Sequence, residues 1–466
     1  MNNAARKKMS KQKKLYVLVV VLLIAIILAL IAGTVQTRTE KIEENGTTVL
    51  SIEPASVTAV SWDTESSSFA FHKSDDAWVY DADEAFPVNA EALDELLAVF
   101  EDFGASFTID DVDNLGTYGL DSPECTIKIS TADEDYTITL GNYSEMDSQR
   151  YFSLGDDQVH LAKNDPTDTF NVELSDLIQN DVVPDVSEAT KLSFSGESDL
   201  SIEYAEDNSA AYSDDDVYFA DGKALDSSKV ETYLSRVKNL NLTSYVTYNA
   251  SQEELEAYGL DKPELTISAT YEENGQSATL EVNVGRNQAE LEKAEASSDD
   301  DAESSVTAYA RIGDSPIVYT ITSTEYTNLM AATYEDLRHE EVLPYDMSEL
   351  TQVDITLDGQ SYSITSTGSG SKQTWTYGDD DDVSISALKS ALSALDADTL
   401  TQDKPTGKEE ISVTLHFDNE NHEKVEITLY RSDGTQCVAV VDGEPYTYVT
   451  RSRVVDLIET VNEIVL

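Results

Sequence analysis

The sequence predicts an α+β fold of three tandem repeats behind a single N-terminal transmembrane helix. Each repeat is expected to be a mainly antiparallel sheet with helices on one face. Three observations lead to this prediction. A turn signature recurs with a period of about 140 residues, apolar residues alternate through short segments separated by turn dipeptides, and one long apolar run lies near the start of the chain.

The N-terminal segment has the charge pattern of a membrane anchor. Residues 1–14 carry six Lys and Arg and no acidic residue, and Leu15 to Ala32 is an unbroken apolar run of 18 residues. A helix of this length rises about 27 Å, close to the thickness of a bilayer core. Because basic residues precede the run, we expect a cytoplasmic tail at 1–14, a single-pass anchor at 15–35 and an extracytoplasmic remainder. The alternative is a protein secreted after cleavage of a signal peptide.

All acidic residues follow the predicted anchor. The 90 Asp and Glu begin at Glu40 and face 24 Lys and Arg, so the exported part has a net charge near −66. This field repels polyanions, and we therefore expect no nucleic-acid partner. The runs Asp214–Asp216, Asp299–Asp301 and Asp379–Asp382 are candidate cation sites, but none has the spacing of a calcium loop. We interpret these acids as solvated, and an acidic, cation-binding surface spacer stays open as an alternative.

The turn signature is the main candidate motif. Tyr118-Gly119-Leu120-Asp121-Ser122-Pro123-Glu124 recurs as Tyr258-Gly259-Leu260-Asp261-Lys262-Pro263-Glu264, and a shorter copy, Asp403-Lys404-Pro405, follows. Pro fixes φ, Asp accepts local backbone hydrogen bonds, and the two glycines are expected at backbone angles that other residues avoid. The two tyrosines are expected to pack on a neighbouring helix. We assign a structural role to the recurring positions, which are Tyr118, Gly119, Leu120, Asp121, Pro123, Tyr258, Gly259, Leu260, Asp261, Pro263, Asp403 and Pro405.

Each module repeats the same order of strands. After a linker at 36–50, we expect modules at 51–187, 188–348 and 349–466. Each opens with a short strand, expected at Val57–Trp62, Lys191–Phe194 and Val353–Leu357. An aromatic strand follows, and its large residue is interpreted as a core anchor in all three modules: Trp78, Tyr218 and Trp375. The second module also carries an insertion at 289–305, rich in Glu, Ala, Ser and Asp, which is expected to be an exposed loop.

Two helices are expected in each module. The first follows the aromatic strand, and its predicted caps are Asn89, then Asp226 or Ser227, then Ser384 or Ser386. The signature leads from this helix into paired strands. A closing helix is then expected at Phe170–Ile178, Glu325–Leu337 and Ser452–Val461.

Sequence patterns for catalysis are not found. The chain has no G-x-S-x-G elbow, no H-E-x-x-H or paired-Cys metal spacing, and no phosphate-binding glycine loop. His339 is expected at a solvent-facing helix end, and Cys125 and Cys437 are expected to be unpaired and buried. We therefore predict no catalytic residue, cofactor or metal site. An envelope glycan hydrolase stays open, because it needs only two carboxylates about 5–10 Å apart.

The signature, the module pattern and the N-terminal anchor together resemble a bacterial family, the domain of unknown function 4340. The resemblance covers nearly all of residues 50–466, although the third copy lacks Tyr-Gly before Asp403. It implies an envelope protein with one N-terminal span and, for some members, an accessory role beside ABC-transporter components of the gliding-motility type. No catalytic residue is carried over. The expected function is non-enzymatic binding to envelope components, with ABC-transporter subunits as candidate partners.

Overall fold

The computed structural model describes residues 46–466, apart from residues 66, 111, 157, 298–301, 369–371 and 381. The predicted tail at 1–14 and the predicted anchor at 15–35 lie outside the described residues. Within the described ranges, no helix has both the length and the apolar character needed to cross a bilayer. The chain divides into two compact units, residues 1–180 and 181–466.

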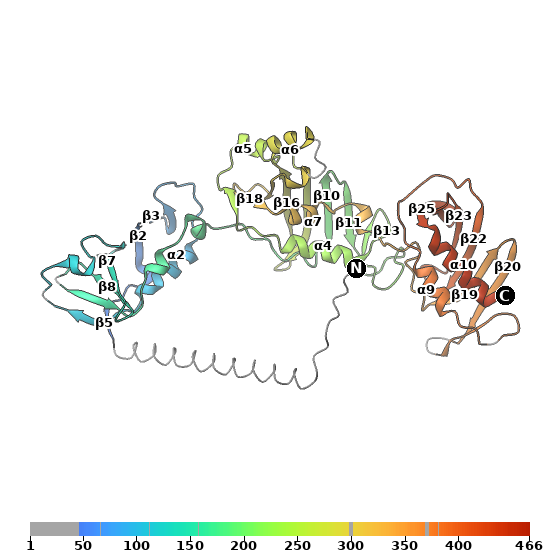
Figure 1. Ribbon diagram of the computed structural model, residues 1–466, viewed down its shortest axis with the longest axis horizontal. Coiled ribbons are helices and arrows are strands. Elements are labelled where there is room, and N and C mark those ends of the chain that lie inside the picture. The colour runs from blue at the N-terminus through green and yellow to red at the C-terminus, as the bar shows by residue number, and fades with distance from the viewer. Residues whose placement is uncertain are drawn as a thin grey trace, which may run out of the picture. The chain divides into compact units, whose positions relative to one another are not determined.

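The described residues form three sheets, one in the first unit and two in the second (Figure 1). Neighbouring strands are antiparallel in all three sheets, as in the pairs that join the two halves of each sheet. This confirms the prediction of mostly antiparallel sheets within an α+β fold.

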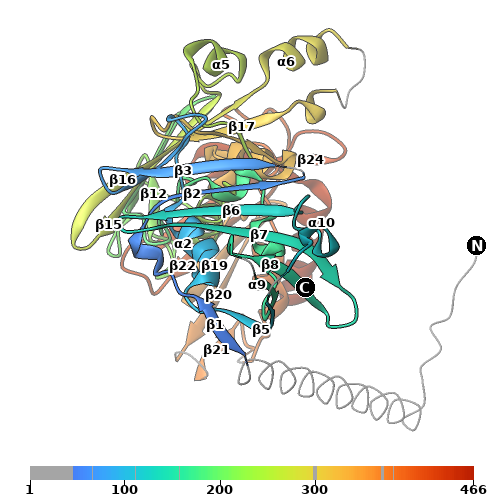
Figure 2. The ribbon, with the colours of Figure 1, turned by 90° about the vertical axis from the view of Figure 1, so that its left-hand side faces the viewer.

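The first sheet begins within the segment expected to be a linker. Its strands are β1 (Thr47–Leu50), β2 (Val57–Thr64), β3 (Ser68–Ser74), β4 (Ala77–Tyr80), β5 (Phe103–Ile109), β6 (Cys125–Thr131), β7 (Asp135–Ser144), β8 (Gln149–Ser153) and β9 (Val159–Ala162). They are ordered β1-β5-β9-β8-β7-β6-β2-β3-β4, and Figure 2 shows β3, β2, β6 and β7 side by side. Trp62 on β2 is buried and stacks on Phe71 of β3, with ring centroids 5.6 Å apart.

The second sheet opens the second unit. Its strands are β10 (Lys191–Gly196), β11 (Leu200–Tyr204), β12 (Tyr218–Ala220), β13 (Lys223–Ala224), β14 (Tyr245–Thr247), β15 (Leu265–Glu273), β16 (Gln276–Arg286), β17 (Ala308–Ile312) and β18 (Val318–Ile321). They are ordered β13-β12-β11-β10-β15-β16-β17-β18-β14.

The third sheet completes the second unit. Its strands are β19 (Leu350–Leu357), β20 (Gln360–Thr367), β21 (Thr374–Thr376), β22 (Glu409–Phe417), β23 (Lys424–Arg431), β24 (Gln436–Val441) and β25 (Glu444–Thr450). They are ordered β21-β20-β19-β22-β23-β24-β25. The alternating residues of β22 and β23 that face inward, including Val413, Leu415 and Ile427, are fully buried in one apolar core.

One strand order recurs in the three sheets. Each sheet has a three-stranded meander beside a four-stranded meander, and the two are joined where the earliest strand of the first pairs with the earliest strand of the second. The orders are β4-β3-β2 beside β6-β7-β8-β9, β12-β11-β10 beside β15-β16-β17-β18, and β21-β20-β19 beside β22-β23-β24-β25. In the first two sheets a further strand extends the four-stranded meander, because β5 pairs with β9 and β14 pairs with β18. The sequence analysis did not predict β5 or β14.

The first helix of each module is present, but only two of the three predicted caps are formed. Asn89 Oδ1 accepts from the Ala92 N–H at the start of α2 (Ala90–Leu97), and Asp226 accepts from the Ser228 and Lys229 N–H groups at the start of α4 (Ser227–Lys238). The third helix, α9 (Ser386–Ser393), follows Ile385 and has no side-chain cap. The predicted serine cap is therefore wrong, because the hydroxyls of Ser384 and Ser386 bond to each other, with their oxygens 3.3 Å apart.

The closing helix is continuous only in the third module, where α10 (Arg451–Val465) confirms the prediction. The helix predicted over 325–337 is instead α7 (Ser323–Met330) followed by α8 (Tyr334–Leu337), because Thr333 forms a new capping box with Asp336. The helix predicted over 170–178 is also wrong. That region has a short α3 (Thr167–Phe170) and a 3-10 turn at Leu174–Leu177, which Glu173 caps.

The insertion in the second module is partly helical. Besides α5 (Gln252–Ala257), which precedes the signature, the second unit has α6 (Gln288–Glu295) inside the predicted loop at 289–305. Asn287 Oδ1 accepts from the Glu290 N–H and so supplies the cap that starts α6. Residues 298–301, with most of the run Asp299–Asp301, lie outside the described residues.

The aromatic anchors are buried as predicted. Trp78, Tyr218 and Trp375 are all among the core residues. In the first and third sheets a lysine ammonium lies over the indole ring, at 4.9 Å for Lys73 and 5.3 Å for Lys389. These contacts cover the outer face of each indole.

Candidate functional site

The turn signature forms a tight corner against the strand that follows it. Gly119 and Gly259 both have the left-handed backbone expected of them, with φ of 73° and 69°. A Cβ on Gly141 would lie 2.2 Å from the Tyr118 carbonyl oxygen, and one on Gly285 would lie 2.5 Å from the Gly259 carbonyl oxygen. The signature corner therefore packs so closely against the following strand that a side chain at Gly141 or Gly285 would clash with the backbone of the corner.

The signature tyrosines pack on tyrosines of the sheet, and Tyr258 also packs against the apolar cluster that contains Leu255 of α5, so a helix contact is formed in the second copy. Tyr118 lies against Tyr151 of β8, with ring centroids 4.9 Å apart, and Tyr258 lies against Tyr309 of β17 at 4.6 Å. The close approach of the corner to the sheet brings both rings over the four-stranded meander.

The signature glutamates bind arginines that the sequence analysis did not single out. Arg150 donates to Glu124 at 2.6 Å and to Asp165 at 2.8 Å, and Arg286 donates through Nε to both carboxylate oxygens of Glu264 at 3.0 Å. The arginines come from different strands, β8 and the end of β16, so no repeated sequence position marks them. Both ion pairs tie the corner to the sheet.

The remaining signature residues lie at the surface or just beneath it. Leu120 and Leu260 are buried, whereas Asp121, Asp261 and Asp403 are exposed and Pro123, Pro263 and Pro405 are half-buried. None of these residues lines the cavity described next.

A cavity of about 190 Å³ lies in the second unit, between the end of the second sheet and the third sheet. We call it the Arg338 cavity. Its lining is Tyr212, Lys223, Ala224, Tyr334, Arg338, His339, Val342, Pro344, Tyr345, Val441 and Tyr446. It is smaller than the ~300–1,000 Å³ typical of drug-sized ligand sites, so it suits only a small molecule or one side chain.

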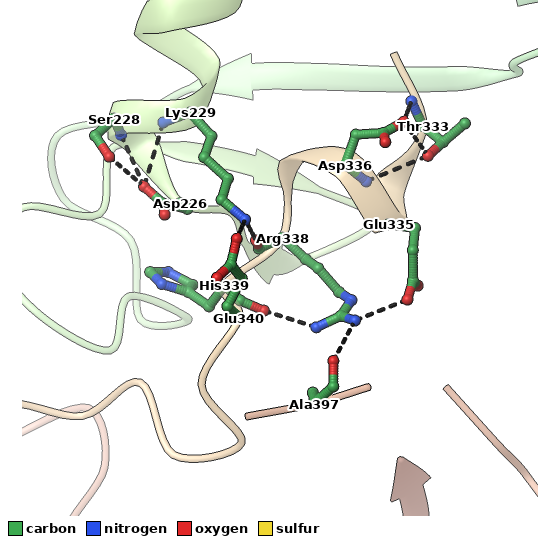
Figure 3. A network of polar contacts seen from close by, with 10 residues as sticks. All are labelled: Asp226, Ser228, Lys229, Thr333, Glu335, Asp336, Arg338, His339, Glu340 and Ala397. Atoms are coloured by element: carbon green, nitrogen blue, oxygen red, sulfur yellow. Dashed lines mark hydrogen bonds and ion pairs between the residues drawn. The ribbon is translucent and has the colours of Figure 1, made fainter. Parts of the chain in front are cut away.

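Arg338 is the central polar group of this cavity (Figure 3). It ends α8 and is only 5% exposed. Its Nη1 donates to the His339 carbonyl at 2.8 Å, and its Nη2 donates to Glu335 at 2.7 Å and to the Ala397 carbonyl at 2.9 Å. Its Nε, although buried, has no hydrogen-bond partner among the described residues.

The backbone around Arg338 is held from both sides. Lys229 of α4 donates to the Arg338 carbonyl at 3.2 Å and to Glu340 at 2.8 Å (Figure 3). The Ala397 N–H donates to the Glu340 carbonyl at 2.7 Å, and Glu341 bridges to Asp396. The segment after α8 is therefore fixed to the segment after α9.

His339, which is half-buried, pairs with the buried Asp216, and this corrects two predictions. His339 Nε2 lies 3.0 Å from Asp216 Oδ1, and the Tyr212 N–H donates to Asp216 Oδ2 at 2.8 Å. Asp216 is 3% exposed, so this member of the acidic run is not solvated. His339 does not face solvent either, because its ring packs on Tyr212 with centroids 5.7 Å apart.

Tyrosine rings form most of the cavity wall. Tyr212 meets Tyr345 edge-on, with centroids 5.1 Å apart, and stacks on His422 at 5.2 Å. Burial, the largest cause, raises the pKa of both Tyr212 and Tyr334 to about 12. Burial also raises the pKa of Tyr345 and Tyr446. The four phenols are therefore neutral at physiological pH and present hydroxyl groups that can donate and accept.

The comparisons with known proteins give one positive result. The model of the family described as "Domain of unknown function (DUF4340)" matches residues 78–263 and again residues 220–412. The two matches together span well over half of the 466 residues. The chain belongs to this family. No curated protein and no solved structure matches the chain.

The two matches of the DUF4340 model begin at nearly equivalent strands of the first and second sheets. They begin at Trp78 in β4 and at Ala220 in β12, which are the outer strands of the first and second meanders. The start positions are 142 residues apart, close to the spacing of 140 between Tyr118 and Tyr258. The family model therefore recurs with the period of the signature.

The thiols and several carboxyl groups of this DUF4340 chain have shifted pKa values. Cys125 and Cys437 are free and buried, as predicted, and burial raises the pKa of each thiol to about 11. Of the carboxyl groups with a shifted pKa, all are lowered, as for Glu340 beside Lys229. In the part of the chain that the structure describes, no three His, Cys, Asp or Glu side chains are grouped as metal ligands.

Proposed function

We propose that the protein is a non-enzymatic binding component of a cell-envelope complex, tethered to the membrane by residues 15–35 with the acidic region outside. An ABC-transporter complex is the partner class that we would test first. The basic tail at 1–14, the 18-residue apolar run and the family membership support this proposal.

The observation that carries the binding role is the Arg338 cavity. Its lining combines neutral tyrosine hydroxyls with the buried guanidinium of Arg338, whose Nε is free to donate. Arg338 is fixed by hydrogen bonds to the His339 and Ala397 carbonyls, so its guanidinium loses little conformational entropy when a ligand binds. A single side chain of a partner protein, bearing a hydroxyl or carboxylate, matches the cavity in volume and polarity.

We also propose that the three sheets are copies of one module, with helices on one face. The recurring strand order, the two signature corners and the staggered family matches support this. The boundaries at 187 and 348 stay predictions. Tandem modules that each bury their own core would present a series of surfaces to an extended partner.

The other two functions receive less support. A glycan hydrolase needs a carboxylic acid with a raised pKa, and the shifted carboxyl groups described above are all lowered. A cation-binding spacer needs open acidic runs, but Asp216 of the first run is occupied by His339 and the Tyr212 backbone.

Photocrosslinking in cells tests the binding role. The photoreactive residue p-benzoylphenylalanine replaces Lys223, which lines the cavity, or Lys262, whose side chain is 91% exposed on the second signature corner. We expect transporter subunits to be captured from position 223 and not from position 262. The proposal is wrong if neither variant captures a membrane complex.

Fractionation tests the tether. Full-length protein should stay with membranes after an alkaline wash and keep the mass of the whole chain. A shortened protein in the soluble fraction would instead establish cleavage of a signal peptide.

A further inference from the structure

A second concave surface lies on the second sheet, away from the Arg338 cavity. It is an open groove of about 740 Å³ that crosses the ends of β11, β12 and β15 and reaches the first turns of α4. We call it the tyrosine groove. Three tyrosines line it, namely Tyr204, Tyr218 and Tyr271. Tyr204 and Tyr218 are direct cross-strand neighbours, and their rings meet at 69° with centroids 5.5 Å apart.

Carboxylates surround these rings without cations to balance them. The groove is lined by Glu188, Glu206, Glu231 and Glu272, and no Lys or Arg is part of its lining. None of these four glutamates is in an ion pair within the described residues. Asp185 at the rim differs, because Lys238 donates to it at 2.6 Å.

Tyr218 is the feature that separates this groove from an ordinary acidic surface. The residue is only 4% exposed, but its hydroxyl is not enclosed: it opens into the groove, and no protein group among the described residues bonds to it. Burial, followed by the charge of Glu231, raises its pKa to about 12, so it is a neutral phenol. The ring is therefore held in the sheet while its hydroxyl can donate to, or accept from, a ligand in the groove.

We propose that the tyrosine groove binds a lysine- or arginine-bearing, extended segment of a partner protein. An ammonium or guanidinium group placed over the tyrosine faces gains cation–π attraction, and the glutamates supply the countercharge. Tyr218, Tyr204 and Tyr271 lie on β12, β11 and β15, and β10 runs between β11 and β15. Neighbouring strands lie about 4.8 Å apart, so the row across these four strands is about 14 Å long. That length equals about four residues of an extended chain, which fits a peptide better than a single small cation.

The charge of the whole exterior supports the same partner. A net charge near −66 attracts basic segments and speeds their encounter with the groove. This inference rests on the proposed binding role, but it uses a surface that shares no residue with the Arg338 cavity.

The test uses the full-length chain in neutral detergent micelles and a fluorescent peptide of alternating lysine and glycine. Fluorescence anisotropy gives the Kd at about 20 mM NaCl, where surface charges are weakly screened. We expect Glu231→Gln to weaken binding about three- to tenfold and Tyr204→Leu, which removes a ring face from the groove, to weaken it about twofold or more. Thermal unfolding of each variant checks that the second sheet is still folded.

Glu203→Gln is the matched control. Glu203 is exposed on β11 beside Tyr204, and its side chain points to the opposite face of the sheet. Its Kd should stay within about twofold of the wild type, because long-range attraction between exposed charges is weak. Equal weakening of peptide binding by Glu203→Gln and Glu231→Gln would overturn the proposal, since the peptide would then be attracted only by the overall charge of the protein.

Two further results would also overturn the proposal. One is absence of peptide binding, and the other is displacement of the peptide by spermidine or Mg²⁺ at equal charge concentration, which would make the ligand a free cation. The Lys223 crosslinking result is independent of these outcomes. Peptide binding without captured transporter subunits would keep the groove and overturn the transporter role, and the opposite pattern would overturn only the groove.

Discussion

At the scale of single residues, Arg338 holds together backbone from two regions of the second unit. Its guanidinium binds the His339 carbonyl, the Ala397 carbonyl and the Glu335 carboxylate. A planar fork of donors suits three acceptors that lie in different directions, which a lysine could not reach at once. The same residue leaves one N–H directed at no protein acceptor, so its structural and binding roles coincide.

Replacement of Arg338 should therefore destabilise the second unit. We expect Arg338→Met to lower the free energy of unfolding by about 2–4 kcal/mol, because buried acceptors lose their donors. Urea unfolding followed by tryptophan fluorescence measures the change. Arg453→Met is the control, since Arg453 is exposed on α10, and it should change the free energy by less than about 0.5 kcal/mol. Equal effects of the two variants would show that Arg338 is not a structural tie.

Alanine substitutions at two glycines of the first unit distinguish the cost of a left-handed backbone from the cost of steric crowding. Gly119 and Gly155 both have positive φ, but only a Cβ at Gly119 would meet other atoms, 2.3 Å from Asn142 Oδ1. Both alanine variants pay for the left-handed backbone, by about 1–2 kcal/mol. We expect Gly119→Ala to cost a further 1–3 kcal/mol or so from overpacking. Similar unfolding free energies for the two variants would contradict the close approach at the corner.

At the scale of elements, the start of some helices is determined by the local sequence, and the start of other helices is determined by tertiary contacts. Asn89 and Asp226 cap their helices as their residue types predict. The start of α9 shows the opposite case, because two serines near Ile385 satisfy each other instead of the helix. The break between α7 and α8 follows from a capping box at Thr333 that an apolar-periodicity argument does not detect.

The caps give a paired prediction. Asn89→Ala should lower the free energy of unfolding by about 1 kcal/mol, because the Ala92 N–H loses its acceptor. Ser386→Ala should leave it unchanged within about 0.5 kcal/mol, because Ser386 caps no backbone donor. Thermal unfolding of the two variants measures both changes. A loss of equal size in Ser386→Ala would mean that the serine caps α9 after all.

At the scale of the whole molecule, charge is the dominant feature. The chain from Glu40 onward has 90 acidic residues, and the ion pairs within its described part involve few of them. Repulsion among the remaining carboxylates opposes the compact state and is screened by salt.

Stability should therefore rise with ionic strength. We expect the Tm at neutral pH to increase by several degrees when NaCl is raised from about 20 to 200 mM, as the Debye length falls. Differential scanning calorimetry measures the change. CaCl₂ at the same ionic strength should give the same Tm if the acids are merely solvated, whereas a larger increase with calcium would favour the cation-binding spacer. A Tm that falls with NaCl would contradict the argument.

The sequence by itself determined the antiparallel α+β class, the family and the position of the signature corners. These depend on local chemistry, such as strand alternation, glycine at positive φ and Asp-x-Pro turns, which repeats visibly in one chain. The aromatic anchors were also predictable, because a large ring at the same place in each module has few alternatives to the core.

The tertiary structure alone decided the site. Tyr212 and Asp216 are more than a hundred residues from Arg338 and His339, and the two pairs meet only in the folded chain, where His339 contacts Asp216 and Arg338 contacts the segment after α9. The arginine partners of Glu124 and Glu264 come from unrelated strand positions for the same reason. Contacts of this kind depend on how the chain returns in space, and residue type and spacing carry no record of that path.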